Sequence, residues 1–196
     1  MKNKLFLKKQ LLYCSIIALL FCYFATASYA AEISAINVNI SNNDIYVTAS
    51  VRLDSKIMND LQEGLSKEFV FYIDLFRRWG IWPNEFVTGK RLTKMLMSNP
   101  IRREYTAVSI EGNIHTEKRF RSMDSMVEWA TNFQNIKLAN IRQLENGTYF
   151  VRFTAESRIR RLPPVVGHFL FFVPEKEFNV SKNSLPFEIN YKGLRQ

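Results

Sequence analysis

Strict alternation of apolar and polar positions begins near residue 36 and predicts a β-hairpin. The alternation continues on both sides of Ser41-Asn42-Asn43-Asp44, a composition typical of a tight turn. Successive side chains of a strand point to opposite faces, so the pattern indicates two paired strands with one buried and one solvated face. The apolar positions are Ile36, Val38 and Ile40 before the turn and Ile45, Val47, Ala49, Val51 and Leu53 after it.

Two short segments change to the spacing of an amphipathic helix. The first begins at Asp54 or Ser55, which can cap a helix, and ends at Gly64, because glycine adopts the left-handed conformation at low cost. The second begins at Ser122. The apolar faces consist of Ile57, Met58, Leu61 and Leu65 in the first helix and Met123, Met126, Val127, Ala130 and Phe133 in the second.

The remaining apolar segments predict further strands. Residues 68–76 are apolar at nearly every position except Asp74, which predicts a central strand covered on both faces. Asn146-Gly147 predicts a type I′ hairpin turn between strands at 138–144 and 148–159. Residues 165–173, bounded by prolines and too short to cross a membrane, predict a helix or strand on the core. Other strands are expected at 86–97, 101–110, 115–120 and 185–191.

These elements predict an α+β fold, a predominantly antiparallel β-sheet with two to three short helices packed on it. The sheet is either curved or folded into a sandwich. Hydrophobic residues make up 47% of the 196 positions and aromatic residues 14%, enough for a folded core. No repeat or linker divides residues 31–196, so we expect one β-rich domain there.

The first 30 residues have the pattern of a secretory signal peptide. Four lysines precede an apolar core at 11–24, and small residues follow at 25–30. Ser28 and Ala30 suit the −3 and −1 positions of a cleavage site, which predicts removal of residues 1–30 and export to the periplasm. The alternative is an uncleaved anchor, because residues 11–31 carry no charge and are long enough to reach across a bilayer, which would hold the domain at the inner membrane.

Cleavage would change both the cysteine content and the charge of the protein. Cys14 and Cys22 both lie within the signal segment, so the mature domain would have no thiol and no disulfide. Four of the 27 basic residues would also leave, and the remaining 23 exceed the 18 acidic residues by five. For an exported, mildly basic domain we expect an anionic lipid or an acidic protein surface as partner, and no nucleic acid.

Several stretches resemble the bacterial family named domain of unknown function 4390. The likeness covers residues 36–188 and rests on the motifs Phe71-Tyr72-Ile73-Asp74-Leu75-Phe76-Arg77-Arg78-Trp79, Arg102-Arg103-Glu104-Tyr105, Phe120-Arg121-Ser122-Met123, Tyr149-Phe150-Val151-Arg152 and Arg161-Leu162-Pro163. Pro164 departs from the pattern, which has a basic residue next to this proline. The resemblance implies an exported or membrane-anchored envelope protein, and it implies no activity.

No catalytic, cofactor-binding or metal-binding motif is present in the sequence. The two histidines, His115 and His168, lie far apart, and neither a nucleophile elbow nor a phosphate-binding loop occurs. His168, with apolar neighbours in the sequence, is expected in the core. Asp74 is expected to pair with a nearby arginine such as Arg77 or Arg78, and the alternative is a functional acid with a shifted pKa. We therefore expect neither an enzyme nor a bound cofactor.

Two segments are candidates for partner binding. Alternation along residues 148–160 sends Arg158 and Arg160 to the polar face, and Arg161 follows them, giving guanidinium groups suited to phosphate or carboxylate. Trp79 and Trp82 lie on either side of Gly80-Ile81 in a loop. If exposed, they would anchor a partner or the lipid interface, but we expect them to be buried and to close the end of the sheet.

The function expected from the sequence is a non-catalytic periplasmic module that binds another envelope component, a protein or an anionic lipid. Two alternatives stay open. One is a hydrolase or transglycosylase that acts on cell-wall polymer through carboxylates, which leave no fixed spacing in a sequence. The other is a carrier of apolar ligands, suggested by the 16 phenylalanines.

Overall fold

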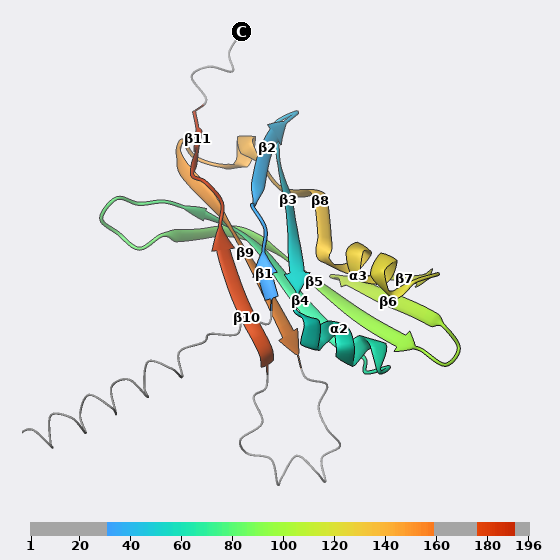
Figure 1. Ribbon diagram of the computed structural model, residues 1–196. Helices are drawn as coiled ribbons and strands as arrows, with labels where there is room; N and C mark the ends of the chain where they lie inside the picture. Colours follow the sequence, from blue (N-terminus) through green and yellow to red (C-terminus); the bar gives the residue numbers. More distant parts are fainter. Residues whose placement is uncertain (1–30, 159–175, 191–196) are drawn as a thin grey trace, which may run out of the picture.

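The computed structural model of the protein describes residues 31–158 and 176–190. These residues form eleven strands and two α-helices, and the fold is α+β with mainly antiparallel sheets (Figure 1). The helices are α2 (Ser55–Gln62) and α3 (Met123–Thr131). The strands are β1 (Ala31–Ile33), β2 (Asn37–Ser41), β3 (Asp44–Leu53), β4 (Lys67–Arg77), β5 (Glu85–Asn99), β6 (Glu104–Glu111), β7 (Ile114–Phe120), β8 (Asn132–Asn140), β9 (Gly147–Arg158), β10 (Lys176–Asn183) and β11 (Phe187–Ile189).

The strands divide into two sheets that share one core. In the smaller sheet β1 and β2 pair with opposite ends of β3, and β8 pairs with its other edge. The larger sheet has the order β10-β9-β4-β5-β6-β7, with β11 added to β9. Phe133 of β8 packs against Phe71 of β4 and Phe153 of β9, with ring centroids 4.7 and 5.2 Å apart. The arrangement is therefore two packed sheets, the second of the two architectures expected from the sequence.

The local signals predicted the turn of the first hairpin and the start of both helices correctly, but Leu65 and Phe133, which were assigned to the helical faces, lie beyond α2 and α3. Asn42 and Asn43 form the turn with φ angles of 52° and 64°, which asparagine tolerates better than most residues. Asp54 caps α2 by accepting a hydrogen bond from the Ile57 amide at 2.9 Å, and Gly64 follows the helix with φ 90°. Ser122 caps α3 in the same way.

The prediction of a hairpin at Asn146-Gly147 was wrong. The strand expected at 138–144 begins at Asn132, directly after α3, and pairs with β3 in the smaller sheet. β9, after the turn, pairs with β4 and β10 in the larger sheet. Neither residue of the turn has the positive φ that a type I′ turn requires. Asn146-Gly147 therefore connects the two sheets instead of joining partners within one.

Two other features of the larger sheet differ from the sequence prediction. β10 was missed, because its only strongly apolar positions are Phe178 and Val180 among polar residues. β4 is central, as expected, but only its core-facing side is almost completely buried, whereas Tyr72, Asp74 and Phe76 on its other side are half-buried. Residues 165–173 and His168 lie outside the described residues.

Candidate functional site

The hairpin of β4 and β5 extends beyond the rest of the larger sheet and ends in an exposed apolar loop (Figure 1). The strands pair as far as Arg77 and Glu85, and we call residues 78–86 the β4–β5 tip. Four large apolar side chains of the tip are exposed to solvent. They are Trp79 at 40%, Ile81 at 96%, Trp82 at 76% and Phe86 at 58% of their surface.

The prediction that Trp79 and Trp82 close the end of the sheet was therefore wrong. The body of the protein does not reach around this loop, so the tryptophans have little to pack against. Burial is the average state of tryptophan, but a loop that projects from a long hairpin has few neighbours to bury it. An exposed apolar tip of this kind indicates a binding surface.

Polar contacts hold the base of the tip in place. The Arg77 guanidinium lies 4.3 Å from the centre of the Trp79 ring, pairs with Glu145 and donates to the Asn146 carbonyl at 3.0 Å. The hydrogen bond to Glu145 raises the pKa of Arg77, which keeps its charge fixed. The indole Nε1 of Trp79 donates to the Glu85 carboxylate at 3.3 Å. These contacts fix the orientation of the Trp79 ring. Ile81 and Trp82 follow it in the loop and are more exposed.

Behind the tip, aromatic rings continue along the outer face of the larger sheet. Phe76 stacks on Phe150 with centroids 5.4 Å apart and meets Phe86 edge to face at 5.8 Å. The Arg152 guanidinium covers Phe76 at 4.6 Å from the ring centre. These contacts connect the tip to the centre of the sheet, where β4 pairs with both β5 and β9.

Asp74 does not have the partner that the sequence suggested. Its cross-strand neighbours are Gly89 and Arg152, and it makes no hydrogen bond or ion pair with Arg77 or Arg78. Burial raises the pKa of Asp74, and the charge of Arg152 opposes this shift. Gly89 leaves the space for the carboxylate, because a Cβ at this position would lie 2.2 Å from Asp74 Oδ1.

Of the three arginine candidates the structure describes only Arg158, which lies far from the tip. Arg158 ends β9 and is half-buried, opposite Glu68 at the start of β4. Arg160 and Arg161 lie outside the described residues. Arg77 lies nine positions after Glu68 on β4, about 30 Å away at the rise of a strand. The structure therefore does not bring Arg158 close to Trp79 and Trp82.

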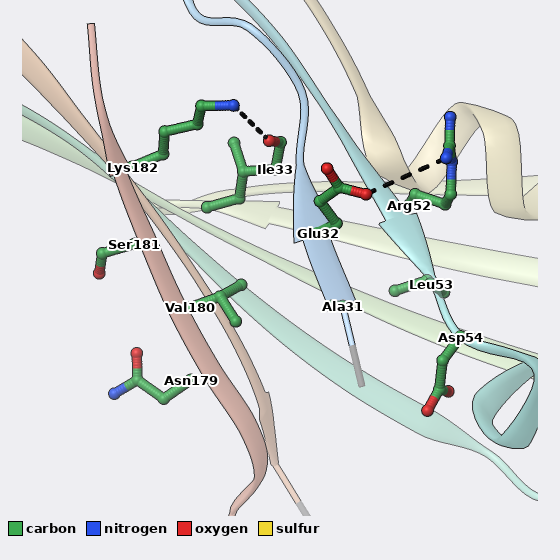
Figure 2. Close-up of a pocket in the computed structure, with 10 residues that line it drawn as sticks. All are labelled: Ala31, Glu32, Ile33, Arg52, Leu53, Asp54, Asn179, Val180, Ser181 and Lys182. Carbon is green, nitrogen blue, oxygen red and sulfur yellow. Dashed lines mark hydrogen bonds and ion pairs between the residues drawn. The ribbon is translucent and has the colours of Figure 1, made fainter. Parts of the chain in front are cut away.

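A groove of about 620 Å³ runs between β1, β3 and β10 (Figure 2). Its two carboxylates already have structural partners, since Glu32 is 4.0 Å from Arg52 and Asp54 caps α2. Lys182 closes one side by donating to the Ile33 carbonyl at 3.0 Å. The two carboxylates and Lys182 of this groove therefore all make structural contacts, and none of them is a candidate catalytic group.

One lysine with unusual surroundings was missed by the sequence analysis. Lys94 of β5 lies on the core-facing side, and burial lowers its pKa to about 8, with Glu111 opposing the shift. The signal was present in the sequence, because a lysine between Leu92 and Leu96 interrupts the apolar face of an alternating strand. Among the described residues, no cluster of side chains is suited to hold a metal ion, and no helix is long and apolar enough to span a membrane.

Comparisons with known proteins identify the family and nothing closer. No curated protein and no solved structure matches the chain. The family described as "Domain of unknown function (DUF4390)" matches residues 28–185, which include every strand from β1 to β10, the β4–β5 tip and Lys94. This agrees with the motifs at 71–79 and 149–152, which form the paired strands β4 and β9. The chain belongs to the DUF4390 family.

Proposed function

We propose that this protein is a non-catalytic periplasmic module that binds the surface of an anionic membrane through the β4–β5 tip. The observation that carries the proposal is the exposure of Ile81 and Trp82 at the end of a hairpin with a fixed base. Holding such side chains in water is unfavourable, and each would gain about 1.5–3 kcal/mol on full burial. A tip of this size supports weak, reversible docking.

The composition of the tip favours a lipid surface over a protein groove. Tryptophan prefers the headgroup region of a bilayer, where the ring is apolar and the indole N–H meets water. Arg78 is exposed and carries no ion pair within the described residues, so it is free to meet an anionic headgroup. The carboxylate of Glu85 is held by Trp79 at the base of the tip.

The proposed compartment rests on the signal-like sequence pattern of residues 1–30. Removal of residues 1–30 would deliver the domain to the periplasm, where anionic lipids are present on the membrane surface. If residues 11–31 stay as an anchor, the tip would still work next to the same membrane. Arg158, Arg160 and Arg161 remain a second candidate for contact with anionic groups.

Vesicle sedimentation tests the proposal with protein purified from the envelope of cells that export it. We expect the wild type to bind vesicles of phosphatidylethanolamine and phosphatidylglycerol, and the double variant Ile81→Ser, Trp82→Ser to bind at least tenfold more weakly. The matched control is Ile101→Ser, because Ile101 is 94% exposed in the turn between β5 and β6. Arg78→Ser should weaken binding to anionic vesicles at low salt and leave binding to neutral vesicles unchanged.

Melting curves establish that the variants are folded, since neither tip residue supports the core. Equal binding by the tip variant and the Ile101→Ser control would refute the membrane proposal. If the wild type ignores vesicles but a photo-crosslinker at Trp82 captures an envelope protein, the tip is a protein-docking surface and the lipid proposal fails.

A further inference from the structure

A hollow of about 600 Å³ lies between the β5–β6–β7 part of the larger sheet and the pair α3 and β8. Figure 1 shows these elements at the end of the molecule opposite the β4–β5 tip. Lys94 extends from β5 into this region, flanked on its own strand by the buried Leu92 and Leu96. Register places it between Phe69 of β4 and Ser109 of β6.

Two ammonium groups meet at one indole ring in the hollow. Lys94 Nζ lies 3.7 Å from the centre of the Trp129 ring, and Lys118 Nζ lies 6.0 Å from the same ring. Lys118 is also 5.3 Å from the Phe120 ring, which packs on Trp129 at 5.6 Å. Neither lysine makes a hydrogen bond or an ion pair with any residue in the described part of the chain. The rings therefore replace part of the hydration of the two charges, but no carboxylate neutralises them.

The acidic groups nearby do not supply the missing partner. Glu111 is bound to Lys90 at 2.7 Å and acts on Lys94 only through space. Glu128 of α3 borders the hollow from an exposed position and forms no ion pair there. The side chains that β8 contributes, among them Asn132 and Gln134, are neutral. The lining thus carries two lysines and two glutamates, and the two lysines are the charged groups that contact the Trp129 ring.

Lys67 is a second core-facing lysine in this fold, and it differs from Lys94 because it has two carboxylate partners. It also lies on the core-facing side of its strand, where Asp60 and Glu177 each hold its ammonium at 2.5 Å. Burial acts to lower the pKa of Lys67, but the hydrogen bonds to these two carboxylates outweigh it and raise the pKa. Lys94 is also partly buried, but no carboxylate is hydrogen-bonded to it, and burial lowers its pKa to about 8. A half-buried lysine that lines a hollow and has no hydrogen-bonded carboxylate is a candidate for ligand binding.

We propose that this hollow binds a small amphiphilic carboxylate, with the head between Lys94 and Lys118 and the apolar body against the rings of Trp129 and Phe120. The volume lies within the range of small-molecule sites in proteins, about 300–1,000 Å³. Leu92, Phe133 and Ile136 add an apolar lining that suits a short hydrocarbon chain. The site is independent of membrane docking, since it uses none of the tip residues.

Isothermal titration calorimetry with decanoate tests the site on the exported protein. We expect Lys94→Met and Lys118→Met each to weaken binding about fivefold or more. The matched control is Lys56→Met, an exposed lysine of α2 that does not border the hollow. Decanol, which has the same chain without the charge, should bind the wild type at least fivefold more weakly than decanoate does.

A measurement on the unmutated protein keeps the test independent of variant folding. The ¹³Cε resonance of Lys94 reports its protonation, and decanoate should raise the pKa of this group, because a bound anion favours the charged form. Equal binding by Lys94→Met and Lys56→Met, equal binding of decanol and decanoate, an unchanged Lys94 titration, or no binding of millimolar decanoate would each overturn the proposal.

Discussion

Replacing Lys94 with methionine should make the protein more stable at neutral pH. The ordinary pKa of 10.5 falls to about 8 in the folded protein because the ammonium is desolvated. A difference of this size would correspond to about 3.4 kcal/mol for a fully shielded group. Since Lys94 is only half-buried, solvent screening reduces the expected penalty to about 1–2 kcal/mol. Methionine fills a similar volume and can contact the Trp129 ring through sulfur, which offsets the lost cation–π contact.

The sign of the pH dependence follows from proton binding. Between pH 8 and 10.5 the unfolded chain holds a proton at Lys94 that the folded protein has released, so the stability of the wild type rises with pH there. Urea unfolding of both proteins at pH 7, 8, 9 and 10 measures this directly. We expect the variant to be about 1–2 kcal/mol more stable at pH 7 and the difference to shrink toward pH 10. A variant that is less stable at pH 7, or a difference that stays constant with pH, would refute the reasoning.

Two further predictions concern the second core-facing lysine and the N-terminus. Lys67→Met should cost about 3–5 kcal/mol in urea unfolding, because Asp60 and Glu177 would be left facing each other without a cation; a loss below 1 kcal/mol would mean that the triad contributes little. Mass spectrometry of protein from the envelope should find Ala31 as the first residue, whereas a full-length chain would show that residues 11–31 remain as an anchor.

The sequence was most informative where a local rule governs the structure. The hairpin around Asn42-Asn43 and the caps at Asp54 and Ser122 each depend on neighbouring residues alone, and all three were predicted correctly. The turn at Asn146-Gly147 was misread because strand pairing is decided by the whole core. In the structure β8 pairs with β3 and packs Phe133 against the rings of the larger sheet, and no local pattern contains these long-range contacts.

The candidate sites were harder to predict than the elements that carry them. The sequence singled out Trp79 and Trp82, but their exposure depends on how far the hairpin extends beyond its neighbours. Lys94 and Trp129 lie on different elements, and only the packing of α3 against the sheet brings them together. Long-range contacts of this kind leave no spacing in the sequence.

The length of β5 has a consequence for how the two proposed sites can be used. This single strand of 15 residues carries Phe86 at the tip and Lys94 at the hollow. Lys94 lies eight positions after Phe86, about 25 Å along a strand that pairs with β4 over this stretch and with β6 from Leu92 onward. The strand thus fixes the distance between the tip and the hollow. If the tip is bound to a bilayer, the opening of the hollow would stay at a fixed distance from the membrane, above the headgroups. Molecules that leave the bilayer could then reach the hollow.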